Sequence, residues 1–236
     1  MTPETLFSRR VAADPTSPML TFYDDASGER AELSGKSLAN WVAKTHFLLT
    51  DELGLIPGDR VFVTMPVHWL TAPVLFGSWF AGLEVISEPG HAAVAFGDAE
   101  SLAQSDLSAV DDVYAVSLLS MARSAEAPRG MSDYAASVRP QPDAWAAVQS
   151  RADAEQPALN GRSRLQVVAD AREAAAELAL SDAARLMWTQ PDFDATAWVH
   201  ALLAPLIVGG SSVLVRHADL AKLDDRAAAE QVSVTR

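Results

Sequence analysis

Short apolar runs alternate along the chain with longer segments in which apolar residues recur every three or four positions. The short runs are typical of buried strands, and they fall at residues 60–65, 84–87, 92–96, 112–118, 184–188 and 212–216. The longer segments predict helices at residues 38–53, 68–83, 165–180, 194–208 and 220–231. Strands that alternate with helices in this way predict an α/β fold, with a mainly parallel sheet and flanking helices.

The N-terminal segment carries a different pattern. Thr2 is suited to cap a helix, with Pro3 at its first position, and this helix is expected to end near residue 13. Residues 19–23 and 29–33 have the composition of strands, and the turn-forming sequence Asp24-Asp25-Ala26-Ser27-Gly28 separates them. The sequence therefore predicts an N-terminal β-hairpin.

Two polar segments interrupt the alternation of strands and helices. Residues 120–142 are rich in small and polar side chains and predict a surface excursion, and residues 153–164 predict a loop. A short helix is expected between them at residues 144–151. We expect a single domain over residues 1–236, with any subdivision near residues 150–165.

Charge and composition exclude several classes of function. The chain has 18 basic and 31 acidic residues, a formal net charge of −13, which disfavours binding to nucleic acid or to an anionic membrane surface. Its lack of cysteine excludes disulfides, thiolate nucleophiles and cysteine-ligated zinc. The N-terminus does not resemble a signal peptide, and the most apolar stretch, residues 69–83, is shorter than the roughly 20 residues of a membrane span. We expect a cytoplasmic protein.

Several motifs occur in a fixed order. A Pro-Gly-Asp turn leads into a predicted strand, a proline follows the strand, and an Ala-Gly pair closes the next helix. A Leu-Thr-Phe strand comes earlier, and a Pro-Leu-x-x-Gly-Gly turn into a strand comes later. These motifs are Leu20-Thr21-Phe22, Pro57-Gly58-Asp59, Pro66, Ala81-Gly82 and Pro205-Leu206-Ile207-Val208-Gly209-Gly210. Together they resemble the N-terminal part of the acyl-adenylate-forming (AMP-binding) enzymes: acyl-CoA synthetases, peptide-synthetase adenylation domains and luciferases.

The resemblance implies a phosphate-binding loop before the helix at residues 165–180. In the family this loop is rich in Ser, Thr and Gly and ends in Pro-Lys, because small residues let backbone N–H groups approach a triphosphate. The corresponding residues 157–165 contain one glycine, no threonine and no lysine. Two interpretations stay open: a remnant that meets a phosphate of ATP or AMP, or a surface loop. The candidate residues are Gly161, Arg162, Ser163 and Arg164.

A second family motif, Pro-x-Phe-His, borders the acyl pocket and reads Pro191-Asp192-Phe193-Asp194 here. The resemblance makes Trp188, Phe193 and Asp194 candidates for contact with a substrate. The other interpretation is that Phe193 belongs to the core and that Asp194 caps the following helix.

Other family segments are missing from this sequence. It has no Gly-Tyr-Gly-x-Thr-Glu segment, no Arg-Thr-Gly-Asp segment and no C-terminal domain with a catalytic lysine. On the family's layout the chain corresponds to roughly the first half of the large domain. Since adenylation depends on positioning and neutralising phosphate, we expect no catalytic residue here.

The histidines give little support for other chemistry. None is spaced for metal binding, so no metal site is expected. His46 is expected to be partly buried with a hydrogen-bond partner, and His68 to be exposed at a helix start.

Three functions fit these observations. The first is a non-catalytic homologue of AMP-forming acyl-CoA synthetases that acts as a binding or interaction module and requires no cofactor. The second is a residual binder of ATP, AMP or an acyl group, or a half-enzyme completed by a partner chain. The third is an unrelated α/β protein. An incomplete sheet leaves an open edge, so we expect a homodimer or another protein partner.

Overall fold

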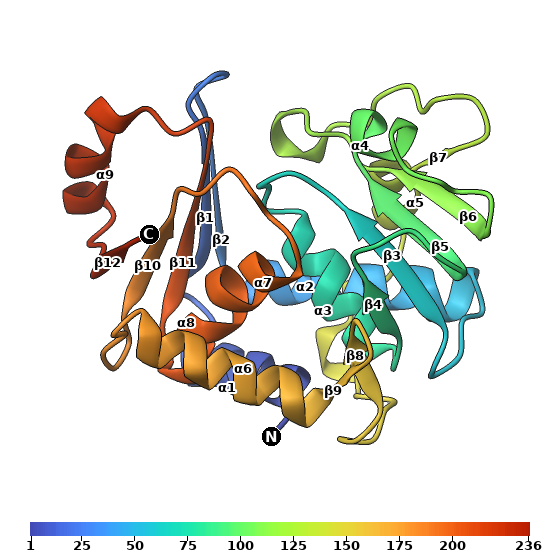
Figure 1. Cartoon of the computed structure of the whole chain (residues 1–236), viewed down its shortest axis with the longest axis horizontal. Helices are drawn as coiled ribbons and strands as arrows, with labels where there is room; N and C mark the ends of the chain where they lie inside the picture. The colour runs from blue at the N-terminus through green and yellow to red at the C-terminus, as the bar shows by residue number, and fades with distance from the viewer. The chain divides into compact units, whose positions relative to one another are not determined.

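The computed structural model describes residues 1–236, apart from the side chain of Met121. The chain forms two compact units, each with its own sheet (Figure 1). The five-stranded unit comprises Met1–Leu38, Pro66–Trp69 and Gln166–Arg236. The seven-stranded unit comprises Ala39–Met65 and Leu70–Leu165. Each unit is described by itself.

The sheet of the five-stranded unit has the order β12-β10-β11-β1-β2. All neighbouring strands are parallel except β1 and β2, which form the predicted antiparallel hairpin. The register places Leu20 of β1 opposite Ser212 of β11, and Leu186 of β10 opposite Ser212 on the other side. The strands are β1 (Pro18–Asp24), β2 (Glu29–Ser34), β10 (Arg185–Trp188), β11 (Ser211–Arg216) and β12 (Val234–Thr235).

Helices pack on this sheet, and their ends follow local chemistry. The Thr2 hydroxyl accepts a hydrogen bond from the Thr5 N–H and caps the first helix, as predicted. Side chains of the last helix pack with Met187, Val213 and Val215 in an apolar cluster. The helices are α1 (Pro3–Ala13), α6 (Arg164–Glu177), α7 (Ala195–Trp198), α8 (Ala204–Ile207) and α9 (Leu223–Ala229), with a 3₁₀ turn at Leu220–Lys222.

The helix expected over residues 194–208 is interrupted by a π-helical turn, Val199–Leu203, between α7 and α8. Pro205 explains the interruption, because it has no N–H to donate to the Ala201 carbonyl one turn earlier. The Ser212 hydroxyl donates to that carbonyl instead, at 2.6 Å. A side chain from the neighbouring strand thus satisfies the backbone group that the proline leaves open.

The sheet of the seven-stranded unit has the order β7-β6-β5-β3-β4-β8-β9. It is parallel except between β8 and β9, so the predicted α/β fold with a mainly parallel sheet is confirmed. Gly97 ends β5 where an added Cβ would overlap the Thr64 carbonyl of β3. The strands are β3 (Arg60–Thr64), β4 (Glu84–Ile86), β5 (Ala92–Gly97), β6 (Val110–Ala115), β7 (Ser132–Asp133), β8 (Pro157–Leu159) and β9 (Arg162–Ser163).

The helix expected at residues 68–83 is shorter, since α3 spans Thr71–Phe80, and every residue of α3 is buried. The remaining helices are α2 (Gly35–Phe47), α4 (Ala99–Ala103) and α5 (Tyr134–Val138), with a π-helical turn at Leu48–Glu52 and 3₁₀ turns at Ser120–Ala122 and Trp145–Ala147. Among the described residues, every helix is too short or too polar to cross a bilayer.

Two expectations about polar segments were wrong. The segment at residues 120–142 is not wholly a surface excursion, because the Tyr134 side chain is buried and its hydroxyl lies 2.7 Å from the Thr45 hydroxyl. The segment at residues 153–164 is not a loop, because β8 and β9 form a hairpin within it. Partners distant in sequence contribute to both segments, since Tyr134 bonds Thr45 and β8 pairs with β4 through Leu159 and Val85.

Candidate functional site

Residues 157–165, where the resemblance implies a phosphate loop, form a tight hairpin at the edge of the seven-stranded sheet. Asn160 and Gly161 both have positive φ, +47° and +78°, as the two central residues of a type I′ hairpin turn require. The Gly161 N–H donates to the Glu84 carboxylate at 2.6 Å, and the Asn160 side chain bonds Ser87. These bonds hold the turn against β4, at its first residue and at the residue that follows it.

Arg164 has a structural role in this hairpin. Its side chain has no exposed surface, and its guanidinium donates to four main-chain carbonyls at 2.7–3.3 Å. These carbonyls belong to Gln156, Pro157, Trp79 and Leu83. Ser163 is buried, whereas Gly161 and Arg162 are exposed. The structure thus brings the four candidates together, and a phosphate contact by Arg162 stays a prediction.

The candidates after β10 lie in the five-stranded unit. Asp194 accepts a hydrogen bond from the Ala197 N–H at 2.9 Å, which confirms that it caps α7. Phe193 is buried, as is Trp188, whose ring lies 6.2 Å from that of His200. Whether Trp188 and Phe193 contact a substrate stays a prediction.

A cavity of about 490 Å³ opens at the carboxyl ends of β10 and β11, and we call it the carboxyl-edge cavity. In open parallel sheets this edge is where ligands bind. Residues that follow the two strands supply most of the lining, and the segment after β3 supplies the rest. The lining residues are Pro66, Val67, Thr189, Gln190, Pro191, Arg216, His217, Ala218 and Leu220.

Arg216 gives the carboxyl-edge cavity its positive charge, and His217 lies beside it in the lining. Among the described residues, no carboxylate lies within ion-pair distance of Arg216, whereas His217 Nδ1 lies 2.7 Å from the Asp24 carboxylate. Burial raises the pKa of Asp24, but the hydrogen bonds with His217, the Ala26 N–H and Ser27, together with the His217 charge, outweigh burial and lower this pKa overall. His217 has a φ of +51°, in the left-handed region that is uncommon for a non-glycine residue. The cavity therefore offers a cation to an anionic ligand.

The expectation for His68 was wrong, and that for His46 was only partly right. His68 is fully buried, its ring lies 4.7 Å from that of Phe22, and burial together with the Arg216 charge lowers its pKa to about 3. His46 is buried, and its Nδ1 has no hydrogen-bond partner among the described residues. Burial, with the Arg151 charge, lowers the pKa of His46 to about 4. Both histidines are neutral at pH 7.

The buried indoles of Trp188 and Trp198, in the five-stranded unit, carry unused hydrogen-bond donors. Within the described part of the chain, the Nε1 atoms of Trp188 and Trp198 have no acceptor. An unsatisfied buried donor costs roughly 1–3 kcal/mol, so a ligand oxygen at either position would be stabilising. No three His, Asp or Glu side chains of the described residues form a group suited to hold a metal ion.

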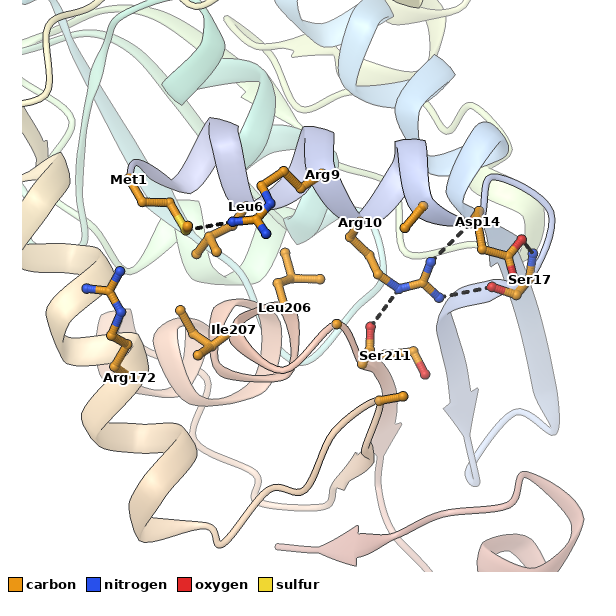
Figure 2. Close-up of a pocket in the computed structure, with 14 residues that line it drawn as sticks. Met1, Leu6, Arg9, Arg10, Asp14, Ser17, Arg172, Leu206, Ile207 and Ser211 are labelled. Carbon is orange, nitrogen blue, oxygen red and sulfur yellow. Dashed lines mark hydrogen bonds between the residues drawn. The ribbon is translucent and has the colours of Figure 1, made fainter.

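A second cavity, of about 600 Å³, lies at the amino ends of β10 and β11, and we call it the amino-edge cavity (Figure 2). Helices α1, α6 and α8 contribute to its walls, and Arg9, Arg10 and Arg172 are among its lining residues. Sequence reasoning missed these arginines and also Arg216 and His217. The sequence did offer a signal for Arg216 and His217, because they lie directly at the end of a predicted parallel strand, where ligands bind in such sheets.

The fold is that of the N-terminal domain of acyl-CoA synthetases. The N-terminal domain of FACL13 from Mycobacterium tuberculosis superposes with a TM-score of 0.74 at 15% identity, covering 98% of this chain and 61% of that one. An acyl-CoA synthetase from Brucella canis superposes with a TM-score of 0.77 at 15% identity, and the match covers 100% of this chain and 47% of that one. A fatty acyl-CoA synthetase from Mycobacterium tuberculosis superposes with a TM-score of 0.71 at 15% identity, and the match covers 98% of this chain and 48% of that one. The chain thus spans between 47% and 61% of the length of these structures.

The chain belongs to the TIGR03089 family. It is 40% identical over 231 residues to a TIGR03089 family protein of Mycobacterium tuberculosis (strain ATCC 25618 / H37Rv). The alignment covers 94% of this chain and 92% of that relative. A scan against protein-family models found no match.

Proposed function

We propose that this chain is a non-catalytic module that uses an acyl-CoA-synthetase-like scaffold to bind a ligand or a partner. The hairpin at residues 157–163 is the observation that carries the proposal. Its Gly161 N–H already donates to the Glu84 carboxylate, and its buried Arg164 is committed to main-chain carbonyls. These groups are the ones that a phosphate-binding loop at this position would have to present to a nucleotide.

Electrostatics at the hairpin support the same proposal. The Glu84 side chain is buried and pairs with Arg60 at 3.0 Å, while its other oxygen accepts the Gly161 N–H. A carboxylate thus occupies the position next to the glycine where a triphosphate would need positive charge. Repulsion between the two anions would oppose binding there.

The carboxyl-edge cavity is the ligand site that we propose for the module. Arg216 supplies positive charge, and the cavity volume of about 490 Å³ lies in the range typical of small-molecule sites. The buried donors of Trp188 and Trp198 favour a second candidate function, in which an acyl group or a nucleotide such as ATP or AMP binds nearby. In that case a partner chain would supply the missing catalytic parts.

Pyrophosphate exchange tests the absence of catalysis. The purified chain is incubated with ATP, magnesium, labelled pyrophosphate and a panel of carboxylic acids. We expect no exchange above that of a heat-denatured sample. An exchange activity that co-purifies with the chain and is lost in the Arg216→Ala variant would refute the non-catalytic assignment.

Calorimetry then separates the two candidate functions. ATP, AMP and an acyl-CoA are titrated into the native chain, into Arg216→Ala and into the exposed control Arg129→Ala. Binding by the native chain and the control, but not by Arg216→Ala, supports the residual binder. Absence of heat for all three ligands supports an interaction module instead.

Assembly and location belong to the same proposal. One edge of the five-stranded sheet is the two-residue strand β12, and the other is β2. Open edges present unpaired backbone groups, which favours pairing with a second copy or a partner protein. We expect light scattering to give the mass of a dimer, and the mass of a single 25.2 kDa chain would contradict this. A cytoplasmic location is proposed with it.

A further inference from the structure

The amino-edge cavity combines positive charge with an apolar floor in a chain whose formal net charge is −13. Three arginines and one aspartate line it, which gives a formal side-chain charge of +2. Figure 2 shows Arg9 of α1 above Leu206 and Ile207 of α8, and Arg172 of α6 to the left of Ile207. The local field therefore has the sign opposite to that of the whole chain.

The cations of the amino-edge cavity are not neutralised by the protein. Among the described residues, no carboxylate lies within ion-pair distance of Arg9, Arg10 or Arg172. Within the described part of the chain, the Arg9 guanidinium donates one hydrogen bond, to the Met1 sulfur at 3.9 Å. Oδ1 of the lining aspartate, Asp14, accepts hydrogen bonds from the turn that follows it. An anion in the cavity would thus meet arginines that lack a counterion.

Arg10 is held in place as part of the wall. Its guanidinium donates to the Gly210 carbonyl, the Asp14 carbonyl and the Ser17 hydroxyl at 2.9–3.0 Å. These bonds use three of the five N–H groups of a guanidinium, so two stay available. A charge fixed in this way loses little conformational freedom when a ligand binds.

Apolar side chains form the floor between the arginines. Leu6 and Leu206 are buried, and Ile207 is half-buried. The volume of about 600 Å³ lies within the range of small-molecule sites and exceeds what an inorganic anion alone would fill. The cavity therefore suits a ligand with an apolar body as well as a charged group.

We propose that the amino-edge cavity binds an amphipathic anion, an apolar body that carries one carboxylate or phosphate group. Arg9 and Arg172 receive the anionic group, and Arg10 adds fixed positive charge. Guanidinium groups match carboxylate and phosphate oxygens in bidentate geometry. This site lies at the opposite end of β10 and β11 from the carboxyl-edge cavity, so it does not depend on the proposed function.

Calorimetry with decanoate as the probe tests the proposal. In a zwitterionic buffer we expect one saturable site per chain with a Kd on the order of 0.1 mM. Acetate carries the same head without the tail, and decyltrimethylammonium carries the same tail with the opposite charge. Neither is expected to saturate. Equal binding of decanoate and decyltrimethylammonium would overturn the proposal, and so would the failure of both decanoate and decyl phosphate to saturate a site.

Variants locate the site. Arg9 and Arg172 are exposed, so Arg9→Glu and Arg172→Glu should fold, which circular dichroism verifies. We expect each to raise the Kd for decanoate about tenfold or more. Arg129→Glu makes the same charge change at an exposed position in the seven-stranded unit and should leave the Kd unchanged. An unchanged Kd in Arg9→Glu and Arg172→Glu would overturn the proposal.

The identity of the head group comes from a comparison of decyl phosphate with decanoate. The ligand with the lower Kd carries the anionic group that the arginines prefer. Either order of the two Kd values supports the proposal. Failure of both ligands to saturate the native chain would refute it, whatever calorimetry with ATP and AMP shows.

Discussion

Replacement of Glu230 by glutamine should destabilise the five-stranded unit in a way that depends on pH. Glu230 follows α9, and its carboxylate accepts hydrogen bonds from Tyr23, Arg30 and Arg185 at 2.6–3.1 Å. Its side chain is only 8% exposed, and that of Arg185 is 12% exposed. The Glu230→Gln substitution keeps the shape but leaves Arg185 without its counterion in a largely buried position.

The pKa of Glu230 gives the magnitude. Burial opposes ionisation, but the three hydrogen-bonding partners outweigh it and lower the pKa from 4.5 to about 2. A shift of this size corresponds to at most roughly 3.4 kcal/mol at 1.36 kcal/mol per pKa unit. The Arg30 side chain is 45% exposed, so solvent screening reduces its share. We expect Glu230→Gln to cost about 2–3 kcal/mol of unfolding free energy at pH 7.

The dependence on pH follows from the sign of the shift. Because the folded-state pKa lies below the unfolded one, the stabilisation is complete above about pH 4.5 and is lost as the pH falls towards 2. Urea unfolding at pH 7, 5, 4 and 3 measures the difference between native chain and variant, which should shrink across this window. The exposed Glu173→Gln is the matched control. The reasoning fails if both variants cost the same, or if the Glu230→Gln difference is as large at pH 3 as at pH 7.

Three other substitutions test the account of the fold by urea unfolding at pH 7. Ser212→Ala removes the donor to the Ala201 carbonyl and should cost about 1–2 kcal/mol; no loss would show that the carbonyl finds another donor. Asp194→Ala removes the cap of α7 and should cost about 1 kcal/mol, whereas Asp194→Asn should retain most of the stability. Gly97→Ala places a methyl group against the Thr64 carbonyl and should cost about 2 kcal/mol or more, and a neutral effect would contradict the close packing of β3 and β5.

Prediction succeeded where a short stretch of chain decides its own conformation. The cap at Thr2, the first hairpin and the parallel strands β3 and β5 all depend on turn chemistry or on runs of apolar residues. Asp194 also followed a local rule, since a capping side chain needs only the backbone of the next turn.

Prediction failed where a distant partner supplies the interaction. Arg162 and Ser163 are polar, yet they form a strand because β8 pairs with them and Glu84 holds the turn between. Tyr134 lies in a polar segment, yet it is buried because Thr45, far away in the sequence, accepts or donates its hydrogen bond. The two-residue strand β12 is too short to leave a periodic pattern.

For the candidate sites too, local sequence predicts one part and tertiary contacts decide the rest. The order of its turns and strands relates the chain to the acyl-CoA-synthetase fold, because each motif is a local solution that the scaffold needs at that point. The Gly161 N–H bonds the Glu84 carboxylate and Arg164 bonds main-chain carbonyls, and only folding brings these partners beside them. The three arginines of the amino-edge cavity come from α1 and α6, and the 150 residues at positions 14–163 separate these helices in the sequence. No pattern in the sequence reveals such a cluster, since charge adds up in space and not along the chain.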